Sequence, residues 1–304
     1  MLPTPLQQLN NKLLNEKQIK LYIKREDLNH PTIQGNKFRK LKYNLAKAKE
    51  ENHKKILTFG GAFSNHVYAV AAAGKAFDIQ TIGVIRGERI EPLNPTLQFA
   101  ESNGMQLHFV TRSAYRNKYQ PEFIQKLKSK FDDFFLVPEG GSNALAVKGC
   151  AEIIDEIDID YDYVCSAIGT GGTLAGLILG TNNYGKVLGF PALKGGDFLQ
   201  KDIVNLLDNN ANNYTNWQLI TDYHFGGYAK FKPELIDFIN DFKRQFNIQL
   251  EPIYTGKMLF GIFDLIQKDF FEKGTTIIAI HTGGLQGIDG FNQRFGDLID
   301  SSVD

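Results

Sequence analysis

The sequence predicts an α/β protein in which helices flank two open, twisted, mainly parallel sheets. Short segments rich in β-branched and aromatic residues alternate with amphipathic helical segments along almost the whole chain, which is typical of βαβ units. The 304 residues exceed a typical single domain, so two closely packed α/β lobes are expected. The composition agrees, because 42% hydrophobic and 22% charged residues are ordinary values for a folded core.

Strands are expected at 19–25, 55–59, 81–85, 106–110, 134–137, 163–167, 186–190, 218–223 and 275–280. Helical patterns are clearest at 37–50, 66–77, 95–103, 144–157 and 233–246. Within 37–50 the apolar residues recur at steps of three and four, so one face of this helix is apolar; they are Phe38, Leu41, Leu45 and Ala48.

Charge and cysteine content exclude several functions. Basic and acidic residues both number 34, so no net field attracts the chain to nucleic acid or to an anionic membrane, and a small-molecule partner is favoured. Cys150 and Cys165 lie in no metal-binding or redox spacing, which predicts buried thiols and no metal site. The N-terminus lacks a basic segment followed by an apolar block, so a cytoplasmic location is expected.

The segment Gly35-Asn36-Lys37 begins the first helical pattern. Glycine lets the backbone approach another group closely, and a lysine in the first turn opposes the helix dipole. That placement is unfavourable without an anionic partner. The alternative is a solvated cluster of basic side chains, which spacing alone favours; its members are Lys37, Arg39, Lys40 and Lys42.

A second feature lies where the expected strand 55–59 ends in two glycines. Ser64, Asn65 and His66 then open an alanine-rich helix, where free backbone N–H groups and polar side chains can bind a carboxylate. A plain N-cap by Ser64 or Asn65 explains the same residues equally well.

A third feature is the glycine- and threonine-rich loop after 163–167. Such a loop can turn tightly while successive N–H groups surround a phosphate at a helix start. It lacks the Gly-Lys-Ser/Thr ending of a Walker loop and the spacing of a dinucleotide fingerprint, so a single phosphate suits it better. The alternative is an ordinary tight connection. The loop consists of Gly169, Thr170, Gly171, Gly172 and Thr173.

Two late segments place polar residues where open α/β sheets bind their ligands. One is Leu250-Glu251-Pro252-Ile253-Tyr254-Thr255-Gly256-Lys257, and the other is Ile280-His281-Thr282-Gly283-Gly284, which ends a strongly apolar strand. A core tyrosine and a satisfied buried histidine are the alternatives.

Taken in order, these motifs resemble the pyridoxal-phosphate enzymes of the tryptophan synthase β-like fold, also called fold type II. Within that fold they resemble the 1-aminocyclopropane-1-carboxylate deaminase/D-cysteine desulfhydrase family. The segments Thr4-Pro5-Leu6 and Ile23-Lys24-Arg25-Glu26-Asp27-Leu28 match as well, so the resemblance spans nearly the whole chain. It implies a smaller lobe, 44–144, inserted into a larger cofactor-binding lobe formed by 1–43 and 145–304, and it implies a homodimer.

The resemblance also implies roles for individual residues. Lys37 would bind pyridoxal 5′-phosphate covalently and act as the base, while Lys40 and the loop Gly169, Thr170, Gly171, Gly172 and Thr173 would hold its phosphate. Asn65 would contact the pyridoxal 3′-oxygen. Ser64, Asn65 and His66 would bind the carboxylate of a small amino-acid substrate. Tyr254 and Tyr228 would lie near the reacting atoms, and Thr255 and Thr282 near the cofactor.

Thr255 and Thr282 decide the expected branch of the family. Deaminase-type members carry Glu and Leu at these places, whereas desulfhydrase-type members carry small hydroxyl residues. The resemblance therefore implies β-elimination from D-cysteine, giving pyruvate, ammonia and hydrogen sulfide. 1-Aminocyclopropane-1-carboxylate deamination is the alternative, and a non-catalytic pyridoxal-phosphate carrier or a nucleotide-binding transferase or oxidoreductase is less favoured. Phe63 and Tyr68 stand where the family commonly has Gln and Arg, which leaves the substrate open.

Overall fold

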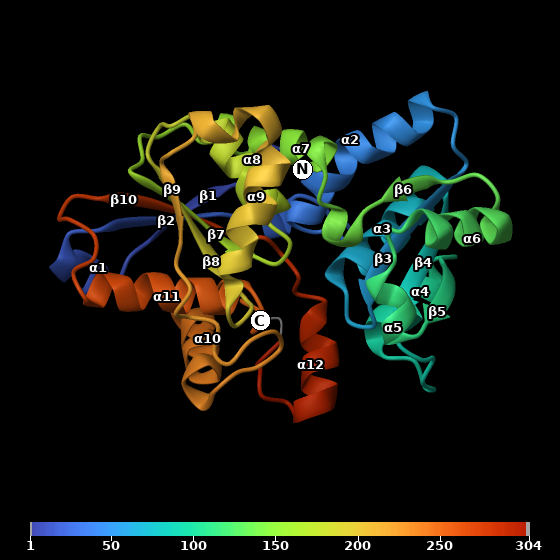
Figure 1. The fold of residues 1–304 in the computed structure, drawn as a ribbon. Helices are drawn as coiled ribbons and strands as arrows, with labels where there is room; N and C mark the ends of the chain where they lie inside the picture. Colours follow the sequence, from blue (N-terminus) through green and yellow to red (C-terminus); the bar gives the residue numbers. More distant parts are fainter. Residues whose placement is uncertain (1, 302–304) are drawn as a thin grey trace.

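The computed structural model describes residues 2–301, which form two sheets flanked by helices (Figure 1). The six-stranded sheet has the order β1 (Leu6–Leu9), β2 (Lys20–Lys24), β10 (Thr276–Ile280), β7 (Tyr163–Ile168), β8 (Lys186–Pro191), β9 (Trp217–Leu219). The four-stranded sheet has the order β5 (Gln106–Val110), β4 (Gln80–Arg86), β3 (Lys55–Gly61), β6 (Phe135–Val137). Within the described residues β1 and β2 pair antiparallel and the other neighbouring strands pair parallel, so the expected fold class is confirmed.

The six-stranded sheet takes strands from both ends of the chain, whereas the strands of the smaller sheet all come from 55–137. In the six-stranded sheet β2 lies beside β10, and Lys20 is paired with Thr276. The lobe limits 44 and 144 remain predictions.

The helices cover both faces of each sheet. On the larger sheet, α7 (Ala144–Asp155), α8 (Gly172–Thr181) and α9 (Leu199–Leu207) lie on one face, and α10 (Pro233–Phe246) and α11 (Thr255–Gln267) on the other (Figure 1). On the smaller sheet, α2 (Asn36–Glu50), α3 (Asn65–Phe77) and α4 (Pro95–Ser102) pack opposite α5 (Arg112–Arg116) and α6 (Pro121–Phe131). The remaining helices are α1 (Lys12–Lys17) and α12 (Gly287–Phe295).

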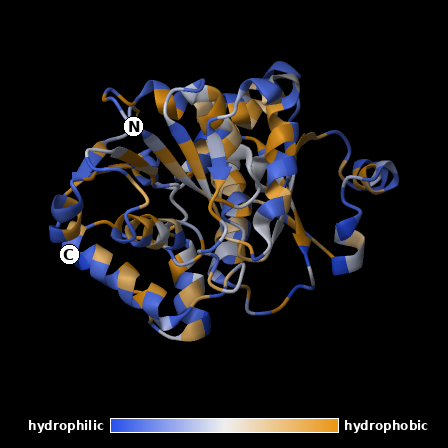
Figure 2. Cartoon of the chain, turned by 60° about the vertical axis from the view of Figure 1, so that its left-hand side comes forward, coloured by the Kyte–Doolittle hydropathy of each residue, from blue (hydrophilic) through white to orange (hydrophobic). Residues whose placement is uncertain are grey.

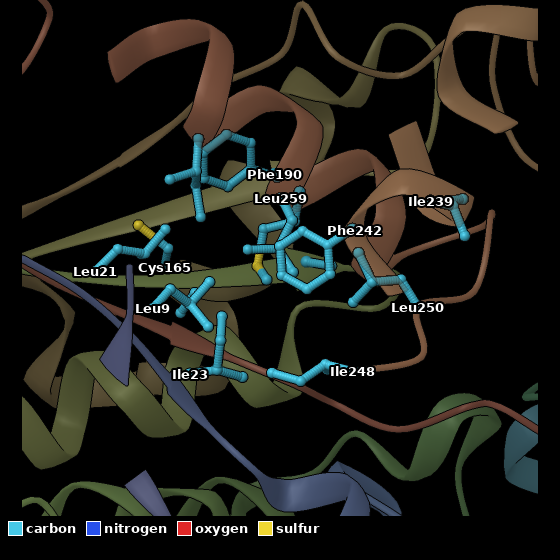
Figure 3. Packing of buried hydrophobic residues seen from close by; sticks show 14 of the residues in the cluster. Leu9, Leu21, Ile23, Cys165, Phe190, Ile239, Phe242, Ile248, Leu250 and Leu259 are labelled. Carbon is cyan, nitrogen blue, oxygen red and sulfur yellow. The ribbon is translucent and has the colours of Figure 1, made fainter. Parts of the chain in front are cut away.

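The core follows the two-residue period of the central strands. In β10, Ile277 and Ala279 pack toward α10 and α11, while Ile278 and Ile280 pack toward α7 and α8. Figure 3 shows the first of these clusters, where Cys165 lies among apolar side chains. The outer helices carry mixed hydrophilic and hydrophobic residues (Figure 2), as amphipathic helices do.

Most expected elements are present, with three differences. Strand β9 ends at Leu219, earlier than the expected 218–223, and the edge strand β1 was not predicted because its four residues include two glutamines. The alternative interpretation of a solvated basic cluster on α2 is wrong for Arg39 and Lys40, because both side chains are buried. Both cysteines are free and buried, as predicted.

No helix among the described residues has the length and apolar composition that a membrane span requires.

Candidate active site

A cavity of about 830 Å³ lies where the carboxyl ends of β3, β4 and β7 meet the first turns of α2, α3 and α8. Open α/β sheets bind ligands at such ends. Every site residue predicted from the sequence lines this cavity, apart from Gly172 and Thr255. The predicted residues that line it are Lys37, Lys40, Ser64, Asn65, His66, Gly169, Thr170, Gly171, Thr173, Tyr228, Tyr254 and Thr282.

Lys37 reaches the cavity from the first turn of α2. The helix begins after Gly35, whose φ is 68°, and a Cβ there would lie 1.9 Å from the carbonyl oxygen of Thr282. Only glycine permits this close approach. Across residues 2–301 the Lys37 amine has no hydrogen bond or ion pair. Burial, and next the neighbouring charge of Lys40, lower the pKa of Lys37 well below its usual value, which favours the neutral, nucleophilic amine.

Lys40 lies one turn further along α2 and is buried. Its Nζ donates to the carbonyl of Gly140 and to Ser142 Oγ, both at 3.1 Å, and burial lowers the pKa of Lys40. Ser142 Oγ in turn lies 2.6 Å from Thr170 Oγ1. Lys40 therefore connects the segment 140–142, which follows β6, to the glycine-rich loop.

The glycine-rich loop leaves β7 and enters α8 at Gly172. Gly171 has a φ of 82°, and a Cβ on Gly172 would lie 2.6 Å from Ser142 Oγ and 3.1 Å from Lys40 Nζ. Thr173 Oγ1 accepts a hydrogen bond of 2.7 Å from the side chain of Asn36. No acidic residue stands in the first turn of α8. Free N–H groups beside a buried lysine, in a turn without room for side chains, fit the phosphate of pyridoxal phosphate.

The start of α3 combines a cap with residues that face the cavity. Ser64 Oγ accepts a hydrogen bond from the Val67 N–H at 3.2 Å, so the N-cap interpretation is confirmed. The Asn65 side chain lies against Gly284, since a Cβ on this glycine would meet Asn65 Nδ2 at 2.7 Å. Ser64 and Asn65 both line the cavity, so capping leaves a ligand role open to them.

His66 is buried beneath the cavity. Its Nε2 lies 2.8 Å from Thr58 Oγ1, which donates to the Val137 carbonyl at 2.9 Å, so Nε2 must donate to the hydroxyl. Burial, and next the charge of Lys37, lower the pKa of His66 well below its usual value. The neutral ring leaves Nδ1 as an acceptor, and this buried atom has no partner within the described residues. A bound ligand or water could satisfy it.

Two tyrosines form another wall of the cavity. The rings of Tyr228 and Tyr254 meet nearly edge to face, with centroids 6.2 Å apart. Burial raises the pKa of Tyr228 and raises that of Tyr254 well above its usual value, so both hydroxyls stay protonated and can donate hydrogen bonds.

Thr255 is buried and faces Glu251. The Thr255 hydroxyl accepts a hydrogen bond from the Glu251 N–H at 3.1 Å and lies 3.2 Å from Glu251 Oε1. The Glu251 carboxylate also accepts the N–H groups of Ile253, Tyr254 and Thr255 at 2.6–2.8 Å, and so stabilises the start of α11. Burial nevertheless raises the pKa of Glu251.

His281 is a buried histidine whose ring nitrogens both have hydrogen-bond partners, as the alternative interpretation predicted. Its Nε2 lies 2.7 Å from the Gln249 carbonyl, and its Nδ1 accepts the Gly283 N–H.

Sequence reasoning missed Asn36, Ser142 and Glu251. Ser142 could have been found, because the glycine pair Gly140-Gly141 comes shortly after β6 and precedes a polar residue, much as Gly60 and Gly61 end β3 shortly before Ser64. Glu251 carried no such signal, since its function depends on the folded path of its own backbone. Within the described chain no group of His, Cys, Asp and Glu side chains is arranged to hold a metal ion.

Known proteins resemble this chain over nearly its full length. The family model described as pyridoxal-phosphate dependent enzyme matches residues 1–283. A putative 1-aminocyclopropane-1-carboxylate deaminase of Pyrococcus horikoshii is 31% identical, covering 97% of this chain and 94% of the relative. The bifunctional D-cysteine desulfhydrase/1-aminocyclopropane-1-carboxylate deaminase, mitochondrial, of Arabidopsis thaliana is 30% identical, covering 94% of this chain and 77% of the relative.

Solved structures agree with the sequence relatives. The crystal structure of an ACC deaminase homologue has a TM-score of 0.85 at 31% identity and covers 97% of this chain and 94% of that chain. A fungal L-serine ammonia-lyase from Rhizomucor miehei has a TM-score of 0.66 at 17% identity, covers 96% of this chain and 98% of that chain, and supports the fold alone. The chain therefore belongs to the family of pyridoxal-phosphate dependent enzymes, with fold type II architecture and pyridoxal 5′-phosphate as its cofactor.

Proposed function

We propose that this enzyme catalyses β-elimination from D-cysteine or a related β-substituted amino acid, giving pyruvate, ammonia and hydrogen sulfide. The observation that carries the substrate assignment is the threonine pair Thr255 and Thr282. Thr282 lines the cavity, and Thr255 has its hydroxyl engaged by Glu251. Neither position brings a carboxylate to the cavity, where one would help the more difficult opening of a cyclopropane ring.

In this proposal Lys37 binds the cofactor covalently and its released amine accepts the substrate α-proton. The depressed pKa of Lys37 supports both tasks, because each requires a neutral amine. When bound, pyridoxal phosphate delocalises the electron pair left on the α-carbon. Gly169 to Thr173 and Lys40 would hold the phosphate, and Asn65 would contact the cofactor ring.

The substrate would be oriented from two sides. The start of α3, with Ser64, Asn65 and His66, offers backbone and side-chain donors to the substrate carboxylate. Tyr228 and Tyr254 stay protonated, so they can stabilise a departing thiolate by hydrogen bonding. Loss of hydrogen sulfide from D-cysteine and hydrolysis of the resulting enamine account for the three products.

1-Aminocyclopropane-1-carboxylate deamination is the second candidate, because the names of both relatives include this activity. The deciding experiment incubates cofactor-loaded protein separately with D-cysteine, L-cysteine, β-chloro-D-alanine and 1-aminocyclopropane-1-carboxylate. We expect pyruvate from D-cysteine and β-chloro-D-alanine, and little or no 2-oxobutyrate from the cyclopropane. Efficient ring opening without any reaction of the two D-amino acids would contradict the proposal.

The homodimer and the cytoplasmic location remain predictions. Sedimentation of the cofactor-loaded protein tests the first, and fractionation of the source cells tests the second.

A further inference from the structure

Lys257 is a buried lysine that the proposed chemistry does not use. It lies on α11, one turn after Tyr254, and is only 2% exposed. It forms no ion pair with any carboxylate in the described chain. Its Nζ instead lies 2.8 Å from the carbonyl oxygen of Gly227, 2.9 Å from that of His224 and 3.5 Å from that of Ala192. An ammonium has three N–H donors, and here each faces a backbone carbonyl.

Two of these carbonyls belong to the loop 224–229, which carries Tyr228. Phe225 and Ala229 both have a φ of 53°, Gly226 has 95° and Gly227 has 121°. Non-glycine residues rarely adopt such backbone conformations, which persist only when the surroundings hold them. Lys257 contacts this loop from the protein interior, at the carbonyl of Gly227, which directly precedes Tyr228.

Lys257 also connects the two cavity tyrosines. Tyr254 lies on the lysine's own helix segment, and Tyr228 follows the carbonyl that the lysine binds. The side chains of these tyrosines meet edge to face. Phe225 packs on Phe260 of α11, and just before the loop Tyr223 donates a hydrogen bond to Asp264 of the same helix. Lys257 adds a direct polar contact to the backbone immediately before Tyr228.

We propose that Lys257 is a positioning residue, whose ammonium gathers three backbone carbonyls and fixes Tyr228 against Tyr254 at the substrate side of the cavity. The inference rests on the proposed function in one respect, that Tyr228 faces the substrate. A buried charge without a carboxylate partner is costly, and an apolar side chain would pack at this place without that cost. The three carbonyls explain why a lysine stands at this position, because one ammonium can donate a hydrogen bond to each of them.

The first test compares the cofactor-loaded Lys257→Met enzyme with a Lys268→Met control. Lys268 lies just after the same helix, is exposed, and pairs only with Asp264 among the described residues. Amide hydrogen exchange is measured by mass spectrometry. We expect exchange in 224–229 to accelerate at least tenfold in Lys257→Met, with β7 and α8 unchanged, and no acceleration in the control. The KM for D-cysteine should rise more than kcat falls, while the cofactor absorbance stays the same.

The second test is chemical rescue. Lys257→Ala leaves three carbonyl oxygens around a space where the ammonium stood, and such oxygens can replace the hydration shell of a monovalent cation. We expect ammonium or potassium chloride to restore slow exchange in 224–229, whereas choline chloride at equal ionic strength does not. The same salts should leave the wild-type and Lys268→Met enzymes unchanged.

A double-mutant cycle connects the loop to the tyrosine. If Lys257 acts through Tyr228, the two substitutions should not be additive. The double variant Lys257→Met/Tyr228→Phe should then be as active as the less active of the two single variants. Two results would overturn the proposal. One is a folded Lys257→Ala enzyme in which residues 224–229 exchange as slowly as in the wild type. The other is fast exchange in 224–229 that neither ammonium nor potassium slows. If Lys257→Met fails to fold, Lys257→Arg, which keeps the donors, should fold and keep the loop protected; a loosened loop there also overturns it. Absence of D-cysteine turnover by the wild type refutes the proposed function and leaves the exchange comparison valid.

Discussion

Helix α2 handles buried charge in opposite ways on two of its sides. Arg39 is 1% exposed, and its Nε and Nη2 donate to the two carboxylate oxygens of Glu26 at 2.8 Å. The same Nη2 also lies 2.8 Å from Glu156 Oε1. Lys37 and Lys40 come from the same helix and have no ion pair in the described part of the chain. The arginine is neutralised within the protein, whereas the two lysines face a cavity.

The network around Arg39 is complete. Lys24 binds Glu156 at 2.8 Å and the Thr4 carbonyl at 2.6 Å, and Glu26 also accepts the hydroxyl of Thr4. Two cations and two carboxylates therefore balance. A buried charge with a structural task therefore has its counter-charge in the chain, whereas the two cavity lysines have none, and burial lowers the pKa of both so that their neutral forms are favoured until an anionic ligand binds.

The largest expected effect comes from removing Lys37. Lys37→Ala should reduce turnover at least about a thousandfold, because both the covalent attachment and the base are lost. Borohydride reduction of the wild type, followed by peptide mapping, should place the pyridoxyl label on Lys37. A label on Lys40 or Lys257 would contradict the assignment.

The pH dependence of cofactor binding distinguishes Lys37 from a lysine with an ordinary pKa. An ordinary lysine titrates near pH 10.4, so its neutral fraction grows about tenfold per pH unit between 7 and 9. Because the pKa of Lys37 is depressed, more of its amine is already neutral at pH 7, and the rate should rise much less as pH increases. Absorbance after adding pyridoxal phosphate to cofactor-free protein measures this. A tenfold rise per unit would count against the depressed pKa.

Removing one partner of the buried ion-pair network should destabilise the fold. Glu26→Gln leaves Arg39 to share a single carboxylate with Lys24, and it should lower the free energy of unfolding by about 3 kcal/mol. Urea unfolding of the cofactor-free protein measures the change. The surviving folded enzyme should still bind the cofactor. A loss below about 1 kcal/mol would show that the network is not a major source of stability.

The phosphate loop should respond to loss of its glycine. Gly171→Val forces a branched side chain into a φ of 82° and brings a Cβ to 2.9 Å from Ile203, at a strain of about 1–3 kcal/mol. Cofactor retention after dialysis should weaken about tenfold or more. Gly104→Val is the matched control, because Gly104 has a φ of 84° with no atom near its Cβ position. Equal cofactor loss in both variants would refute a specific role for the loop.

The smallest effect is expected on the exposed side of the same helix. Lys42 pairs with Glu152 at 2.7 Å, but its side chain is 45% exposed. Lys42→Ala should change the free energy of unfolding by less than about 1 kcal/mol and leave cofactor binding unchanged. Thermal and urea unfolding beside wild type test this, and a change as large as that of Glu26→Gln would remove the distinction between the buried and exposed pairs.

The sequence predicted what depends on local pattern. Helical periodicity placed α2, the glycine before it predicted a close approach, and Ser64 predicted its own cap. Burial of Arg39 could not be predicted, because its partners Glu26 and Glu156 lie far apart in the chain and meet only after folding.

The same reason explains the parts of the site that sequence reasoning missed. Ser142 meets Lys40 although the two residues are 102 positions apart in the chain, and Glu251 acts by accepting backbone N–H groups that no motif displays. The short edge strand β1 depends on its pairing with β2, which its own residues signal only weakly.

The pairing of β2 with β10 has a consequence for synthesis of the chain. Lys20 and Thr276 stand side by side, so β2, which precedes Lys37 and can pair early with β1, gains its second neighbour only after β10 has been translated. The smaller sheet, by contrast, can form from strands that are translated consecutively. The larger sheet beside Lys37 is therefore completed only once β10 has been made, and a chain terminated before β10 would hold this lysine without its complete site.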